Sequence, residues 1–250
     1  MLACAMLCGA SSILAAPAAA SKDAVPTAKA ASGSKTALRL SELLNPPDQL
    51  EGIALRGFET GFDAALKSNP DDAALFTDNP GLREAIFEAA RPIFRKYVAA
   101  QIPAKEQKFA DFYARKFTPQ DMEELLAFYS SPTGTKVIAQ TYANLDLNKI
   151  AEDALATNGE GKMNGEDVGE ITTSAAAKVL PGLDADDFKA LFIFSGTPAF
   201  EKLRAAMPEF QQLTAELANE TDPATDAEVQ AAVEGAVKKY MAQKDSAPKH

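Results

Sequence analysis

Apolar side chains recur three or four positions apart through residues 38–242, and no stretch of four or more residues alternates in the manner of a half-buried strand. This spacing gathers the apolar residues on one face of each helix. The sequence therefore predicts an all-α fold, a helical bundle. Residues 21–37 and 243–250 lack the pattern, so we expect a disordered N-terminal spacer and a disordered C-terminal tail.

Prolines and glycines predict where the early helices end. Short helices are expected at residues 41–44 and 50–66, and another begins at Leu82. Pro92 should kink or restart that helix, because proline lacks the backbone N–H and clashes with the preceding turn. We expect a further helix after Pro103.

The best-specified segment is a pair of helices that begins at Thr118. Thr118 is expected to cap the first helix, with Pro119 at its first position and Asp121 completing a capping box. Ser131, again followed by proline, begins the second helix in the same way. Gly134 lies in that helix's first turn, although glycine costs about 1 kcal/mol relative to alanine within a helix. We expect close packing of the preceding helix to require this glycine.

The same pattern returns 66 residues later without a gap. Asp184 and Thr197 occupy the capping positions there. We interpret this as an internal duplication of a helical hairpin; convergence is the alternative, since caps and such spacing recur in any bundle. The hairpins span about 103–157 and 170–220, with a Gly-rich acidic connector at 158–169. The identical pairs are Asp121 and Asp187, Leu125 and Leu191, Phe128 and Phe194, Pro132 and Pro198, and Lys136 and Lys202.

The first twenty residues carry no charged side chain and end in three alanines. This composition is typical of a secretory signal peptide, and we expect cleavage after about Ala20, with an uncleaved anchor as the alternative. Both cysteines, Cys4 and Cys8, lie in this segment. The mature chain would then contain no thiol and no membrane-spanning segment.

The first hairpin carries a moderately specific run of residues: Phe117-Thr118-Pro119, Glu124-Leu125-Leu126, Phe128-Tyr129, Ser131-Pro132, Gly134 and Lys136. Through them, about residues 90–143 resemble the family of exported bacterial helical proteins known as domain of unknown function 2059. The resemblance implies a helical protein of the periplasm and brings no activity. The second copy, about residues 175–217, is degenerate, because Ser195 and Phe200 stand where the first has Tyr129 and Gly134.

Charge and composition argue against several classes of function. The net charge of −10 disfavours binding to nucleic acid, whose phosphates it would repel. The single histidine is the terminal His250, so no serine–histidine or cysteine–histidine nucleophile and no ordinary zinc site is expected. No glycine-rich phosphate-binding motif occurs. We therefore expect no cofactor and no metal.

These observations favour a non-enzymatic binding or structural module of the cell envelope, which would bind a protein or an apolar small molecule. Its oligomeric state stays open. The alternative is an envelope hydrolase with a serine, lysine and carboxylate site between Tyr129 and Lys136. Aromatic stripes at helical spacing more often fill a core than form a ligand site. The candidate groove residues are Tyr97, Phe109, Phe112, Tyr113, Phe128, Tyr129 and Lys136.

Overall fold

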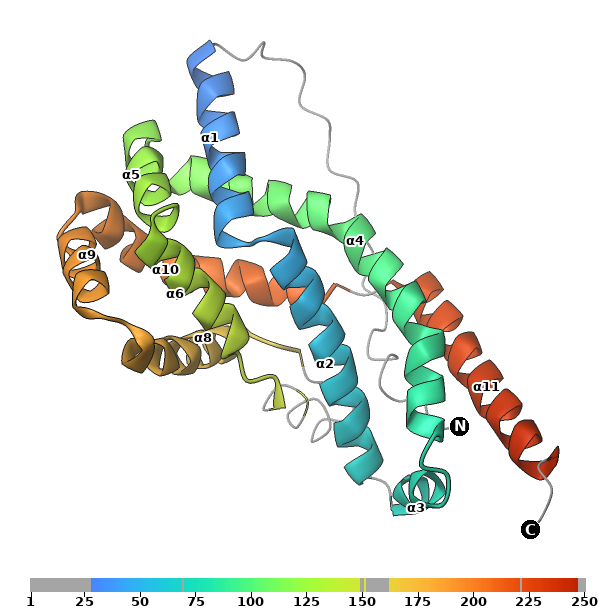
Figure 1. Ribbon diagram of the computed structural model, residues 1–250. Coiled ribbons are helices and arrows are strands. Elements are labelled where there is room, and N and C mark those ends of the chain that lie inside the picture. Colours follow the sequence, from blue (N-terminus) through green and yellow to red (C-terminus); the bar gives the residue numbers. More distant parts are fainter. Residues whose placement is uncertain (1–27, 69, 149–150, 152–161, 221, 247–250) are drawn as a thin grey trace.

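A computed structural model describes residues 28–68, 70–148, 151, 162–220 and 222–246 (Figure 1). Within these residues all regular secondary structure is helical, and the predicted all-α fold is confirmed. The expected signal peptide lies outside the described residues, as does the start of the connector, residues 158–161. None of the described helices is long and apolar enough to span a membrane.

Most of the helices follow one another with short connections. The helices are α1 (Ala28–Leu44), α2 (Pro47–Ser68), α3 (Pro70–Asp78), α4 (Leu82–Lys116), α5 (Pro119–Tyr129), α6 (Pro132–Ala143), α8 (Gly165–Val179), the 3-10 turn η1 (Leu180–Gly182), α9 (Ala185–Ser195), α10 (Pro198–Ala218) and α11 (Pro223–Ser246). Residues 144–164 separate α6 from α8.

The long helix α4 connects two apolar clusters. Near its start it packs against α2 and α11, where Leu82 and Ile86 are buried beside Val229 and Val233. Near its end it packs against α1, and Phe112 lies in a second cluster with residues of α1, α5, α9 and α10. Figure 1 shows α4 running from one region to the other. The two hairpins meet at the second cluster.

The prediction of a new helix after Pro103 was wrong, and Pro92 does not restart the helix. Pro92 and Pro103 both lie inside one helix that runs from Leu82 to Lys116. Each proline removes one backbone hydrogen bond and disfavours the helix by about 3 kcal/mol. Burial of nine α4 side chains against α1, α2, α10 and α11 provides the offsetting stabilisation. Local sequence shows the proline penalty, whereas only the tertiary contacts show what opposes it.

Three helices also extend into segments that were expected to lack regular structure. Helix α1 begins at Ala28, inside the expected spacer, because an alanine-rich stretch extends the helix that Ala37 and Leu40 anchor in the core. Helix α8 begins at Gly165, inside the expected connector, where Asn164 and Asp167 form a capping box. Helix α11 runs to Ser246, into the expected tail.

Candidate functional site

The two hairpins begin with the same hydrogen bonds. Thr118 Oγ1 accepts from the Asp121 amide at 3.2 Å, and the Asp121 carboxylate accepts from the Thr118 amide at 2.8 Å. In the second hairpin Asp184 Oδ1 accepts from the Asp187 amide at 2.9 Å, and Asp187 Oδ2 accepts from the Asp184 amide at 3.2 Å. The predicted capping box at Thr118 is confirmed, as is the predicted cap at Asp184, which also forms a box. They fix Asp121 and Asp187 at equivalent positions in the first turn.

Gly134 is the point of closest approach within the first hairpin. A Cβ atom there would lie 2.2 Å from the Phe128 carbonyl oxygen and 2.5 Å from the Tyr129 Cα. Both are backbone atoms, so the clash could not be relieved by a side-chain rotation. The predicted need for glycine is confirmed. The second hairpin has Phe200 at this position, so its two helices must diverge more at the turn.

The aspartates and lysines of the two hairpins pair across their junction. The Lys202 ammonium donates to both oxygens of Asp121 at 2.7 Å. Reciprocally, the Lys136 ammonium donates to Asp187. Because Asp121 is equivalent to Asp187 and Lys136 to Lys202, each hairpin offers the same residues to the other. Such reciprocity defines an approximate two-fold relation, and an internal duplication predicts it.

The two equivalent phenylalanines meet at the centre of this arrangement. Phe128 and Phe194 stack with ring centroids 3.8 Å apart and an interplanar angle of 3°. Tyr129 adds an edge contact to Phe194 at 5.6 Å, which has no equivalent because Ser195 occupies that position in the second hairpin. The sequence identified the repeated residues but gave no sign that they contact one another.

The ion pairs set the charge state of this junction. Hydrogen bonds from Lys136, Thr133 and the Asp184 amide lower the pKa of Asp187 to about 2. The reciprocal bond raises the pKa of Lys136. Burial raises the pKa of Asp121, but bonds from Lys202 and Thr118 outweigh it, so the net direction is down. Burial alone raises the pKa of Tyr129 to about 12. All four groups are therefore in their ordinary charge states at neutral pH.

Acid should weaken the junction through Asp187. Its folded-state pKa of about 2 lies below the value of about 3.9 for a free aspartate, so its ionised form stabilises the fold above pH 4, and this contribution is lost as the pH falls toward 2. We expect the Tm of the wild type to fall more steeply between pH 4 and pH 2 than that of Asp187→Asn, as measured by circular dichroism. The exposed neighbour supplies a control, Asp186→Asn, which should follow the wild type. Parallel curves for all three proteins would contradict the prediction.

Four of the predicted groove residues lie on α4, in two different settings. Phe109, Phe112 and Tyr113 are buried and surround Phe210 at centroid distances of 5.3 to 6.0 Å, so their rings fill the interior. Tyr97 lies elsewhere along α4, with its ring 6.4 Å from Phe94.

The other three predicted groove residues lie at the hairpin junction. Phe128 and Tyr129 contact the ring of Phe194, and Lys136 pairs with Asp187. The structure therefore brings these three side chains together with the second hairpin, away from Tyr97.

The groups of the alternative hydrolase site are engaged separately. Ser130 Oγ donates to the Leu126 carbonyl at 2.6 Å, and Ser131 Oγ accepts from the Gly134 amide at 3.1 Å. The Lys136 ammonium is directed to Asp187 and lies 3.7 Å from Asp184. A lysine base must lose its proton near neutral pH, whereas two carboxylates favour the charged form here.

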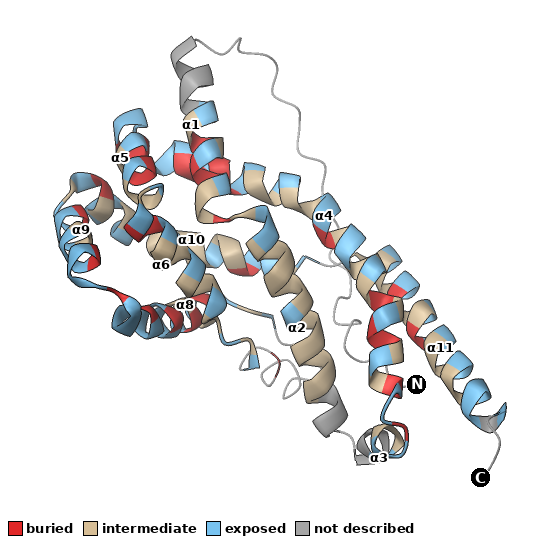
Figure 2. Ribbon diagram, viewed as in Figure 1, coloured by how far each residue is buried: buried red, intermediate tan, exposed pale blue. Residues whose placement is uncertain are grey.

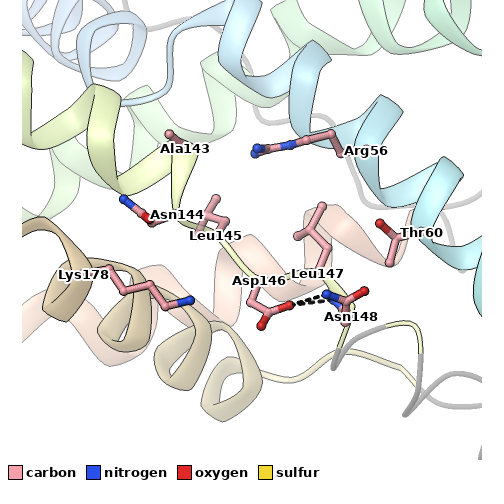
Figure 3. Close-up of a pocket in the computed structure, with 9 residues that line it drawn as sticks. All are labelled: Arg56, Thr60, Ala143, Asn144, Leu145, Asp146, Leu147, Asn148 and Lys178. Atoms are coloured by element: carbon pink, nitrogen blue, oxygen red, sulfur yellow. Dashed lines mark hydrogen bonds between the residues drawn. The ribbon is translucent and has the colours of Figure 1, made fainter.

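A separate polar hollow of about 310 Å³ lies between α2, α8 and the segment after α6 (Figure 3). Arg56 and Lys178 face it together with Asp146, which accepts hydrogen bonds from the Asn148 amide and side chain. These bonds lower the pKa of Asp146. Asp146 partly neutralises the two cations. It suits water or a small polar solute.

Comparison with known proteins adds one match. Residues 106–153 match the model of a family described as "Uncharacterized protein conserved in bacteria (DUF2059)". The resemblance predicted for the first hairpin is confirmed, over a segment that starts and ends later than expected. No curated protein and no solved structure matches the chain. The DUF2059 segment comprises the end of α4, all of α5 and α6, and the residues that follow.

One exposed apolar surface lies outside the DUF2059 segment and was not predicted from the sequence. Helix α9 exposes Phe192 by 80%, Ile193 by 62% and Phe188 by 48%. Figure 2 shows α9 at the edge of the molecule, largely exposed. We call Phe188, Phe192 and Ile193 the α9 face. The equivalents of the two phenylalanines in the DUF2059 segment, Met122 and Leu126, are buried. Both hairpins carry apolar residues at these two positions, so a comparison of the hairpins could have identified the α9 face. It could not have shown that the face is exposed.

Proposed function

We propose that this protein is a non-enzymatic binding module of the bacterial cell envelope that holds a protein partner on the α9 face. The single observation that carries the proposal is the exposure of two phenylalanines and an isoleucine on one short helix. Scattered apolar residues are ordinary on protein surfaces, whereas a cluster of large ones marks an interaction site. Aromatic residues in particular supply much of the binding energy at protein interfaces.

The rest of the chemistry supports binding over catalysis. The lysines and aspartates at the hairpin junction neutralise one another, and the serines nearby satisfy backbone groups. Within the described residues, no group of three or more potential ligands is placed to hold a metal ion. The hairpin junction thus holds α9 in place through Phe194 and Asp187, while the α9 face stays exposed.

Site-specific photo-crosslinking in cells tests the proposed surface. A benzophenone amino acid placed at Phe192 should give discrete adducts with a protein partner after irradiation. The matched control places it at Lys238 on α11, whose side chain is also largely exposed. Adducts at residue 192 alone support the proposal. Absence of adducts at 192, or the same adducts at both positions, would contradict it.

Export is the second part of the proposal and rests on the uncharged, alanine-rich first twenty residues. The crosslinked protein should be recovered from the periplasmic fraction with Ser21 as its first residue, as determined by N-terminal sequencing. A chain that retains Met1 and stays in the cytoplasm would contradict this assignment.

A further inference from the structure

The two-fold relation between the hairpins places a counterpart of the α9 face on α5, and helix α1 covers that counterpart. Helix α5 carries the equivalent positions in the first hairpin, and there Met122 and Leu126 lie in one apolar cluster with Ala37 and Leu40 of α1. Helix α1 packs against both α5 and α4. The position that α1 occupies in the first half has no helix over it in the described second half, and Phe188 and Phe192 are exposed there as a result.

The packing of α1 on α5 also indicates which side chains a helix on the α9 face would need. Among residues 34–44 of α1, two of the three buried positions, Ala37 and Ser41, have small side chains that let the helix lie close to its support, and the third is Leu40. The α9 face is bulkier than its counterpart, since phenylalanine replaces methionine and leucine. A helix lying on α9 must therefore present small side chains opposite these rings.

The charge beside the α9 face differs in sign from that beside its counterpart. Glu123 on α5 accepts a hydrogen bond from Thr36 Oγ1 of α1 at 3.4 Å. The equivalent residue on α9 is Lys189, which is exposed. An ammonium group requires an acceptor, and a carboxylate is the strongest one a protein offers. The residue that faces Lys189 should therefore be acidic.

We infer that the occupant of the α9 face is an amphipathic helix of a partner protein, with small residues along its apolar stripe and an acidic residue opposite Lys189. This inference rests on the proposed function and names the class of partner. Helices bind in this way through side chains at positions i, i+3, i+4 and i+7.

The size of the face argues against a stable dimer of this chain as the occupant. Helix α9 has 11 residues, which corresponds to a length of about 16 Å and a width of about 10 Å. Two such faces would cover on the order of 200 Å² each, whereas a stable dimer buries about 800 Å² on each partner. The same small area means that a partner helix would bind here in a weak, transient complex, the class with the smallest interfaces.

A peptide based on the sequence of α1 tests the inference directly. The probe is residues 34–45 of this chain with Thr36→Glu, held helical by a covalent staple between positions 35 and 39, whose side chains are exposed on α1. We expect saturable binding to the full-length protein, measured by fluorescence anisotropy. Phe192→Ala should weaken it by about tenfold or more, because a buried aromatic ring is lost. Phe192 is exposed, so an unchanged thermal unfolding curve will show that the variant folds.

The charge beside the face provides a second readout. The wild type should prefer the Thr36→Glu peptide over a Thr36→Lys peptide by about two- to fivefold, the range of an exposed ion pair. Lys189→Glu should reverse that preference, whereas Lys238→Glu should leave it unchanged. An unaltered preference in Lys189→Glu would overturn the assignment of an acidic residue.

Other outcomes separate this inference from the proposed function. Adducts at residue 192 in cells without binding of the peptide would overturn the helical partner and leave the binding module standing. No adducts in cells would remove the proposed function itself. Self-association of the wild type that Phe192→Ala abolishes would show that a second copy occupies the face, and would overturn the inference.

Discussion

Replacing Phe194 with alanine is expected to lower the free energy of unfolding by about 3–5 kcal/mol, the range for removing a buried phenylalanine. Phe194 is 6% exposed, stacks on Phe128 and makes edge contacts with Tyr129 and Phe200. The substitution removes the ring stacking that joins the two hairpins at their centre. Urea denaturation followed by circular dichroism measures the change.

A double-mutant cycle shows whether the stack itself contributes. Phe128→Ala and Phe194→Ala together should cost less than the sum of the single changes, by about 0.5–1.5 kcal/mol, because the second truncation removes a contact already lost. Phe192→Ala on the same helix is the control, since that ring is 80% exposed and should have little effect on stability. Strict additivity would mean that the two rings do not interact in solution.

Replacing Gly134 with alanine is expected to cost about 3 kcal/mol, toward the upper end of the range for overpacking. The added methyl group would lie 2.2 Å from the Phe128 carbonyl oxygen, and either α5 or α6 would have to move. This movement should also weaken the pair of Lys136 with Asp187. The same denaturation experiment measures the loss.

Gly235 provides the matched control for this substitution. It lies within α11, and a Cβ atom there would meet nothing within 4 Å. Gly235→Ala should therefore stabilise the protein, by up to about 1 kcal/mol, because alanine favours the helix. Equal effects at the two glycines would show that close helix packing is not the reason for Gly134.

Local patterns predicted those parts of the fold that depend on neighbours in the sequence. Thr118, Asp184 and Asn164 each form a capping box with the residue three positions later, and the first two were recognised. The third was assigned to the connector because glycines surround it. Continuity of α4 through Pro103 could not be predicted, because the packing that offsets the proline involves helices distant in sequence.

In the candidate site, too, some features were visible in the sequence and others depend on tertiary contacts. The repeated Asp, Phe, Pro and Lys residues were visible as a pattern, but pairing of Asp121 with Lys202 and of Lys136 with Asp187 depends on how the hairpins face each other. The α9 face was not foreseen. Phe188 and Phe192 have the spacing of core residues, and spacing is the same whether or not another helix covers them.

By itself, then, the sequence determined where the hairpin helices begin, which faces are apolar and why Gly134 must be small, because these depend on hydrogen bonds and contacts within a few turns of chain. Only the tertiary structure decided which equivalent residues meet and which apolar face stays uncovered. Burial depends on elements far apart in the sequence, and α1 covers one of two similar helices while leaving the other to solvent.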